Sequence, residues 1–210
     1  MSQVWTDHKD AANKALDAKD WEVAIKEWQG ALEEAEKFAK GDGRLVASLE
    51  GLAQVQFLKG NHAEAESLYK RALALRESAQ GNDHQDIATV LNNLGAVYFK
   101  RGFYKDAMSH FERSLALRRK CFPAEHLEVG KSLYHLALVC HAEQRYDEAD
   151  GHYRKTLDIK NKSLGNNHPD LINLLRNYAH LLRKTSRDSI ASQMEQFASG
   201  IESKLKASSN

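Results

Sequence analysis

Proline, cysteine and long apolar runs are scarce in this 210-residue chain. It has 2 prolines and no serine- or glycine-rich tract, so no segment is typical of a flexible interdomain linker. No apolar run approaches the roughly 20 residues that a membrane-spanning helix needs. The first ten residues, MSQVWTDHKD, lack the basic and apolar regions of a signal peptide. We therefore expect neither a membrane span nor a secretion signal.

Cysteine usage and charge indicate an ordinary folded protein. The 2 cysteines, Cys121 and Cys140, form no C-x-x-C pair, and we interpret them as free thiols of a reducing compartment, the cytoplasm. The formal net charge is +1, and residues 151–210 carry 10 Lys or Arg against 5 Asp or Glu. This gradient lacks the dense basic stripe of a nucleic-acid-binding surface. It favours at most an acidic partner for the C-terminal part.

One motif recurs along the chain at a step of 42 residues. Three histidines mark it: His84 in GNDHQD, His126 in PAEHLE and His168 in GNNHPD. The same step relates His62 to Tyr104 and Tyr146, Ala65 to Ala107 and Ala149, Tyr69 to Phe111 and Tyr153, and Leu73 to Leu115 and Leu157. A step of 41 relates the first member of each set to Trp21, Ala24, Trp28 and Leu32. A fixed period of this length is typical of a repeat protein that stacks helical units.

Each unit has the apolar spacing of two helices joined by a turn. In LNNLGAVYFKRG, residues Leu91, Leu94 and Tyr98 follow the i, i+3, i+7 pattern of one helix face. Gly102 then suits a short turn, because glycine tolerates a positive φ. Small residues recur on both helices: Ala53, Gly95, Ala137 and Ala179 on the first, and Ala65, Ala107, Ala149 and Ala191 on the second. Small residues at a crossing let two helix axes approach to about 8 Å, so each unit is predicted to be an antiparallel helical hairpin.

The segment LNNLGAVYFKRGFYKDAMSHFERSLAL resembles the tetratricopeptide repeat. The signature positions are occupied by Leu91, Leu94, Gly95, Tyr98, Gly102, Tyr104, Ala107, Phe111, Ser114 and Leu115. The 42-residue step, against the family's usual 34 or so, and the phrases LNNL and GNNHPD resemble the longer repeat of kinesin light chains. The resemblance implies an all-α fold, a right-handed superhelical solenoid of about five antiparallel helix pairs with a C-terminal capping helix.

We expect the repeat array to occupy residues 1–187, followed by the capping helix at 188–206 and a disordered tail at 207–210. The expected helix pairs are 3–37, 43–79, 85–121 and 127–163, with the first helix of the last pair at 169–185. The match is weaker at both ends: Ala11, Ala12 and Ala15 replace bulkier residues, and Ser186, Asp188 and Glu195 replace a glycine and two aromatics. Atypical terminal repeats are expected, because their outer faces meet water.

The resemblance also implies a concave groove lined by the first helix of each pair. Mapped on this sequence, its stripe comprises Thr6, Lys9, Asn13 and Leu16; Ala47, Glu50, Gln54 and Phe57; Thr89, Asn92, Ala96 and Phe99; Lys131, Tyr134, Leu138 and His141; and Asn173, Arg176, His180 and Arg183. The candidate binding residues are Lys9, Asn13, Glu50, Gln54, Asn92, Lys131, Tyr134, Asn173, Arg176 and Arg183. Amides, cations and aromatics suit an extended peptide, although any solvated helix face has a similar composition.

The charges of this stripe bear on the partner. Chaperone-binding members of the family hold a C-terminal carboxylate with a Lys and an Asn, which Lys9 and Asn13 match, but Gly51 replaces the next Asn of that clamp. We therefore do not expect a chaperone tail. The basic end of the stripe favours an acidic segment instead; it comprises Lys131, Arg176, Arg183 and Lys184.

The sequence thus favours a non-enzymatic, cytoplasmic scaffold that binds a peptide or a partner protein in its groove. The alternative is a self-associating structural or docking subunit of a larger complex. No glycine-rich phosphate loop, nucleophile elbow or HExxH motif is present. We expect no catalytic residue, cofactor, metal, nucleic acid or membrane partner.

The three spaced histidines are interpreted as structural. Equivalent points of stacked hairpins lie on the order of 10 Å apart, whereas zinc ligands lie about 2.0–2.3 Å from one ion. His84, His126 and His168 therefore cannot share a metal. Each precedes by two residues a carboxylate that is expected in the first turn of a helix, where the helix dipole favours it. These carboxylates are Asp86, Glu128 and Asp170.

Overall fold

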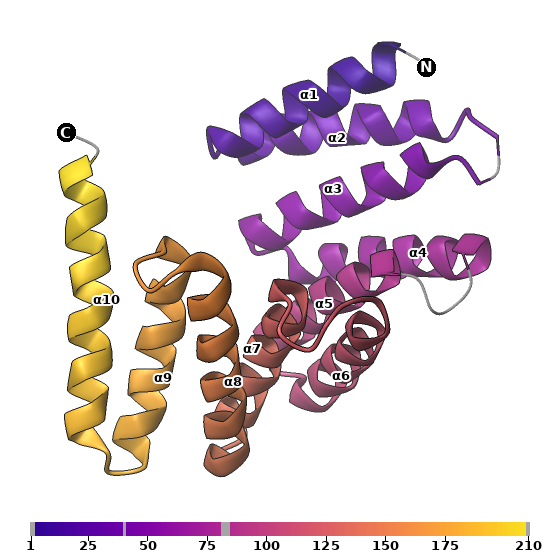
Figure 1. Cartoon of the computed structure of the whole chain (residues 1–210). Helices are drawn as coiled ribbons and strands as arrows, with labels where there is room; N and C mark the ends of the chain where they lie inside the picture. Colours follow the sequence, from indigo (N-terminus) through magenta and orange to yellow (C-terminus); the bar gives the residue numbers. More distant parts are fainter. Residues whose placement is uncertain (1–2, 40, 81–84, 209–210) are drawn as a thin grey trace. The chain divides into compact units, whose positions relative to one another are not determined.

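The computed structural model describes residues 3–39, 41–80 and 85–208, and every regular element in these ranges is a helix (Figure 1). His84 lies outside the described residues. The chain forms two compact units, residues 1–110 and 111–210, which meet within one helix. Each unit is described by itself. The predicted all-α fold of consecutive helix pairs is confirmed.

Unit 1 is a stack of helical hairpins. Its elements are α1 (Gln3–Asp17), α2 (Trp21–Ala35), α3 (Gly43–Lys59), α4 (His62–Gln80), α5 (Gln85–Lys100) and the first turns of α6 (Tyr104–Cys121). Helix α1 packs on α2 and α3 on α4, while α2 stacks on α3 and α4 on α5. Ala12, Ala24, Ala53 and Ala65 are fully buried. Their missing side chains let the paired helices approach closely.

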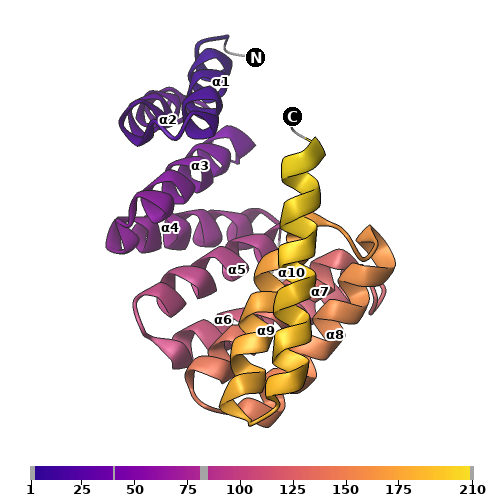
Figure 2. The same ribbon diagram turned by 90° about the vertical axis from the view of Figure 1, so that its left-hand side faces the viewer.

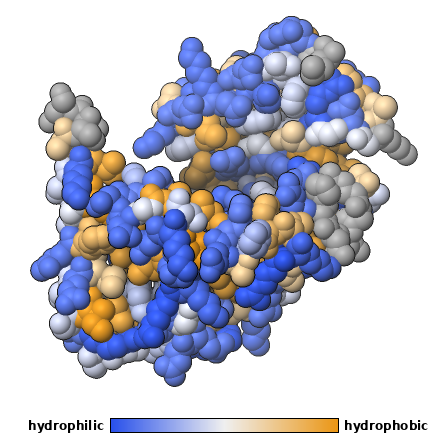
Figure 3. Space-filling model, viewed as in Figure 1, coloured by the Kyte–Doolittle hydropathy of each residue, from blue (hydrophilic) through white to orange (hydrophobic). Residues whose placement is uncertain are grey.

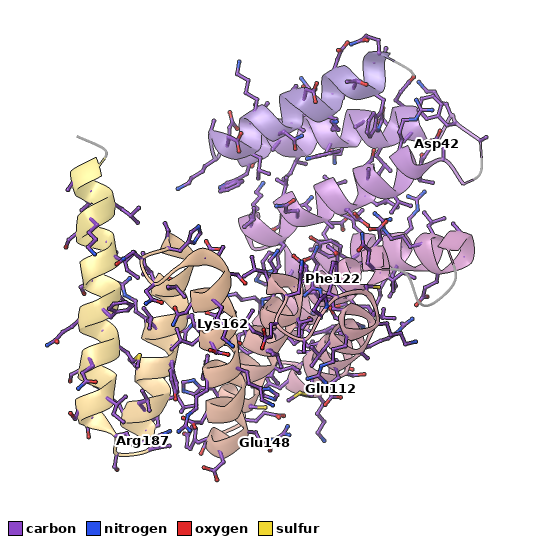
Figure 4. The ribbon with its side chains drawn as sticks, in the orientation of Figure 1. Asp42, Glu112, Phe122, Glu148, Lys162 and Arg187 are labelled. Carbon is purple, nitrogen blue, oxygen red and sulfur yellow. The ribbon has the colours of Figure 1, made fainter. Side chains whose placement is uncertain are left out.

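Unit 2 continues the same plan. It comprises the rest of α6, then α7 (Leu127–Ala142), α8 (Tyr146–Leu164), a 3-10 turn (Pro169–Leu171), α9 (Ile172–Lys184) and α10 (Asp188–Ser208). Helix α7 packs on α8, and α10 runs alongside α9 (Figure 2). Arg187, in the turn between α9 and α10 (Figure 4), forms an ion pair with Asp150 of α8 at 2.8 Å.

The capping helix α10 is longer than the sequence suggested. It ends at Ser208, so residues 207–208 belong to the helix rather than to a tail, and residues 209–210 lie outside the described part. The physical reason is local: Ala207 is a strong helix former, and no glycine or proline stands between Ile201 and Ala207 to stop the helix. The other helix ends lie close to the expected ones.

The turn inside each hairpin needs a positive φ, whether or not it holds a glycine. Equivalent turn positions are Lys19 (φ 58°), Gly60 (95°), Gly102 (79°), Gln144 (62°) and Ser186 (57°). The substitution of glycine by Ser186, noted in the sequence, therefore leaves the turn geometry unchanged. A side chain at such a φ costs on the order of 1 kcal/mol. Three of the five turns carry this strain.

The loop before α7 and the loop before the 3-10 turn are fixed by their histidines, His126 and His168. His126 Nδ1 accepts a hydrogen bond from the backbone N–H of Glu128, and His168 Nδ1 accepts one from Asp170, both at 3.2 Å. Each ring thus caps the N-terminus of the following helix. The ring of His126 also stacks on Phe122 at 4.3 Å between centroids. The structural interpretation is confirmed for these two histidines.

The carboxylates that follow the histidines close the same loops with ion pairs. Each is paired with a cation ten residues earlier, in the last turns of the preceding second helix. The pairs and their N···O distances are Arg76–Asp86 (2.9 Å), Arg118–Glu128 (3.0 Å) and Lys160–Asp170 (3.9 Å). The cations are themselves 42 residues apart. These pairs tie the end of one hairpin to the start of the next.

Candidate functional site

The stacking of hairpins brings an aromatic residue of each second helix against the next first helix. The residue it meets differs from pair to pair. Trp28 lies against Gly51, where an added Cβ would come 2.4 Å from the indole ring. Tyr69 and the polar Asn93 line one small hollow, whereas Phe111, which has no hydroxyl, stacks on the ring of His135 at 4.8 Å between centroids. Each partner residue therefore suits the size and polarity of its aromatic.

This pattern explains one departure from the chaperone-binding clamp. Gly51 stands where that clamp needs an asparagine, and the indole of Trp28 fills the space that an asparagine side chain would occupy. Trp28 is 6% exposed, so it has little freedom to move aside. Packing of the first two hairpins thus excludes the clamp at this position.

A hollow of about 260 Å³ opens on the first-helix side of unit 1. It is formed by α3, α4 and α5, and its lining residues are Gln54, Phe57, Leu58, Tyr69, Asn93 and Ala96. Three of them, Gln54, Phe57 and Ala96, belong to the stripe that the sequence predicted. Tyr69 is 3% exposed, and its burial raises the pKa of the phenol, so the hydroxyl stays protonated at neutral pH. The hollow thus combines apolar rings with neutral hydrogen-bonding groups.

The sequence missed Asn93 and chose its neighbour, Asn92. One residue turns a helix by about 100°, and the hollow lies on the Asn93 side. The equivalent residues in the next two repeats, each 42 residues further along the chain, are His135 and Asn177. Asn177 donates a hydrogen bond of 2.6 Å to the hydroxyl of Tyr134. The recurrence of polar residues at these positions was the signal that could have identified Asn93.

The remaining predicted residues of unit 1 are partly engaged within the protein. Lys9 lies over the Trp5 ring, 5.4 Å from its centroid. Glu50 accepts two hydrogen bonds from Arg76, at 2.6 and 3.1 Å. Asn13 is exposed. Of the candidates on α1, α3 and α5, only Gln54 lines the hollow.

In unit 2 the candidate binding cations Lys131, Arg176 and Arg183 already have carboxylate partners. Arg176 donates to Glu202 at 2.9 Å, and Arg183 donates to Glu195 at 2.7 Å. Both glutamates lie on α10, and Glu195 occupies the position that holds an aromatic in the other second helices. The open side of the last hairpin is therefore lined by ion pairs, as suits a cap in water. Lys131 is paired with Glu128 as well, whereas Asn173 is exposed.

Within the described ranges, no three His, Cys, Asp or Glu residues are grouped so that they could hold a metal ion. In the same ranges, no helix has the length and apolarity required to span a bilayer. Both cysteines are free, Cys121 exposed and Cys140 buried. Burial raises the pKa of the Cys140 thiol, which therefore stays protonated and unreactive at neutral pH.

A family model for the tetratricopeptide repeat matches residues 6–78, 44–120 and 128–198. The chain belongs to the tetratricopeptide repeat family. Among solved structures, it is similar to BtubC (BKLC) from P. vanneervenii, with 18% identity, a TM-score of 0.79 and coverage of 93% of this chain and 78% of that one. It is also similar to the kinesin light chain TPR-like repeats of Podosopora anserina, with 18% identity, a TM-score of 0.78 and 99% coverage of both chains.

This tetratricopeptide protein has further structural neighbours in the apo form of RapI, at 15% identity and a TM-score of 0.72, covering 99% of this chain and 86% of that one. No curated protein sequence matches the chain. At such low identities the solved structures show the fold alone. The predicted resemblance to the kinesin-light-chain type of repeat is confirmed. Tetratricopeptide arrays are protein-interaction scaffolds and are generally not catalytic.

Proposed function

We propose that this chain is a non-enzymatic scaffold that binds an extended peptide or a partner protein on the first-helix side of its hairpins. The observation that carries the proposal is the hollow formed by α3, α4 and α5 in unit 1. A volume of about 260 Å³ accommodates one large side chain of a ligand. A cytoplasmic location goes with the free thiols and is part of the proposal.

The chemistry of the hollow suits a peptide. Phe57, Leu58 and Ala96 offer an apolar surface for one anchor side chain, while Gln54 and Asn93 offer amides. Side-chain amides both donate and accept hydrogen bonds, so they can pair with the backbone of an extended segment on either side of its anchor. The amide of Asn13, in the same unit, is exposed and is proposed to extend this contact.

The preference for an acidic ligand rests on fewer groups than the sequence indicated. Arg176 and Arg183 are each neutralised by a glutamate of α10. An acidic segment would have to displace these glutamates, which costs the existing ion pairs. We therefore propose that the ligand is selected mainly by its apolar anchor and backbone, and that its net charge is secondary.

The test is a pair of matched substitutions in unit 1. Peptides selected from a display library on the purified chain are titrated by fluorescence anisotropy against Ala96→Trp and Ala74→Trp. Ala96 lines the hollow, whereas Ala74 is exposed on α4 and lines none of it. Ala96→Trp fills the hollow and is expected to raise the dissociation constant of the peptide at least tenfold. Ala74→Trp is expected to leave the dissociation constant within twofold of the wild-type value. Unchanged binding by a folded Ala96→Trp variant would refute the proposal.

A second function, self-association or docking within a larger complex, is favoured by the exposed side of α10. Ile190, Phe197 and Leu205 are 43%, 42% and 37% exposed, and apolar surface shows on this helix in Figure 3. The equivalent positions of Ile190 and Phe197 in α8 hold Glu148 and Lys155. Exposed apolar side chains in a row are typical of a contact surface.

Sedimentation at several protein concentrations tests this second function. Self-association through α10 predicts an average mass that rises with concentration, and a Phe197→Ser variant that stays monomeric. A wild-type chain that is monomeric at every concentration would exclude self-association and leave only docking to a different protein.

A further inference from the structure

Two histidines from different helices of unit 2 meet at their ring nitrogens. His141 is in the last turn of α7, and His180 is in the middle of α9. Nε2 of His141 and Nδ1 of His180 form a hydrogen bond of 3.1 Å, and the rings are stacked with their centroids 5.0 Å apart and 25° between their planes. An ion shared by the two nitrogens replaces this hydrogen bond and requires the His180 ring to turn out of the stack. Two nitrogens that share one divalent ion at about 2.0–2.1 Å each are themselves on the order of 3 Å apart. The pair therefore already has the separation of two ligands of one ion.

A buried tyrosine can fix the tautomer of His141. Nδ1 of His141 lies 3.3 Å from the hydroxyl of Tyr153, a side chain of α8 that is fully buried. When this nitrogen donates its proton to the hydroxyl, Nε2 is left with a free lone pair on the side of His180. Histidine ligands of metals are typically oriented in this way, by a hydrogen bond from the nitrogen that does not bind the ion.

The groups around His141 also bear on the binding of a cation. Burial, together with nearby His180 and Lys184, lowers the pKa of His141, so this imidazole is neutral at pH 7. The groups that face it are Tyr153 and Tyr146 from α8 and His180 and Lys184 from α9. His180 is exposed, so its ring can turn to aim its lone pair at an ion. Lys184 opposes the binding of a cation by its own charge.

We propose that His141 and His180 form a two-histidine site for a divalent transition-metal ion of the kind that imidazole prefers, Ni²⁺, Cu²⁺ or Zn²⁺. Water completes the coordination, because two protein ligands leave the other positions open. A histidine binds a metal ion in its neutral form, with the remaining proton on the other ring nitrogen; here these nitrogens are Nδ1 of His141 and Nε2 of His180. The site is independent of the peptide-binding proposal, since the hollow lies in the other unit.

The probe for this site is Ni²⁺ alone, titrated into the full chain at pH 7.5. Nuclear magnetic resonance of the imidazole C–H groups reports which histidines bind, because the paramagnetic ion broadens the signals of its ligands. We expect the signals of His141 and His180 to broaden first, at one equivalent. His141→Gln and His180→Gln are each expected to weaken binding at least tenfold.

Two further variants separate this site from general binding to surface histidines. Lys184→Gln removes the opposing charge and is expected to tighten Ni²⁺ binding several-fold. His110→Gln, at a solitary histidine of α6, is expected to leave the affinity unchanged and serves as the control. Equal broadening of all histidine signals, or an unchanged affinity in a His180→Gln variant with a wild-type circular dichroism spectrum, would overturn the proposal.

Discussion

His135 makes the stability of this protein depend on pH in a defined direction. Its ring lies at the junction of α6 and α7, stacked on Phe111. Burial lowers the pKa of His135 from 6.5 to about 4, and the nearby cations Arg118, Lys160 and Lys131 act in the same direction. The group is therefore neutral in the folded protein at a pH where it would be charged in the unfolded chain.

The sign of the effect follows from proton binding. Between pH 6.5 and 4 the unfolded chain binds more protons at His135 than the folded chain does, so the free energy of unfolding falls as the pH falls through this range. Above pH 6.5 the folded and unfolded states bind equal numbers of protons at His135, so its contribution to the free energy of unfolding is constant. At about 1.4 kcal/mol per pH unit, the loss by pH 4 reaches about 3 kcal/mol, and less where water reaches the partly exposed edge of the ring.

The substitution His135→Asn tests this directly, because asparagine is the residue that the chain itself uses at the equivalent positions 93 and 177. Urea unfolding is followed by circular dichroism at pH 7.5, 5.5 and 4.5 for both proteins. The wild type is expected to lose about 2–3 kcal/mol more than the variant between pH 7.5 and 4.5. An equal loss in both proteins would refute the assignment of a depressed pKa to His135.

The remaining predictions concern glycines. Gly102→Ala is expected to lower the free energy of unfolding by about 1 kcal/mol through its positive φ alone, since its added Cβ meets open space. Gln144→Gly, at the equivalent turn, is expected to raise the free energy of unfolding by a similar amount. Changes of the same sign for Gly102→Ala and Gln144→Gly in urea unfolding would contradict the turn geometry. Gly51→Ala is expected to cost about 1–3 kcal/mol or more by overpacking. Gly200→Ala, whose added Cβ meets nothing in α10, is the control and is expected to be stabilising by up to about 1 kcal/mol.

The architecture could be predicted because its determinants are local and repeated. The apolar spacing, the alanines at the helix crossings and the 42-residue step each predict the same hairpin. An atypical residue in one repeat is therefore outweighed by the residues at the same position in the other repeats. The structural role of His126 was predicted from the carboxylate two residues later, whereas its capping hydrogen bond is seen only in the structure. Only the end of α10 was placed too early, because no residue there marks a stop.

The candidate site was harder to predict because it depends on helix rotation and on contacts between helices. Asn92 and Asn93 differ by one position, and only the packing of α3 against α4 and α5 decides which one reaches the hollow. The ion pairs of Arg176 and Arg183 depend on how far α10 extends along α9. Tertiary packing decides both which amide reaches the hollow and which ion pairs form, and the local sequence does not indicate either.

The central claim is that ligands bind in the hollow of unit 1. The most direct measurement is the nuclear magnetic resonance spectrum of side-chain amide groups, recorded while a selected peptide is titrated into the chain. Binding in the hollow predicts that the signals of Gln54 and Asn93 shift in proportion to the bound fraction, and that Ala96→Trp abolishes these shifts. Saturable binding that leaves both amide signals in place and instead shifts residues of α10 would contradict it.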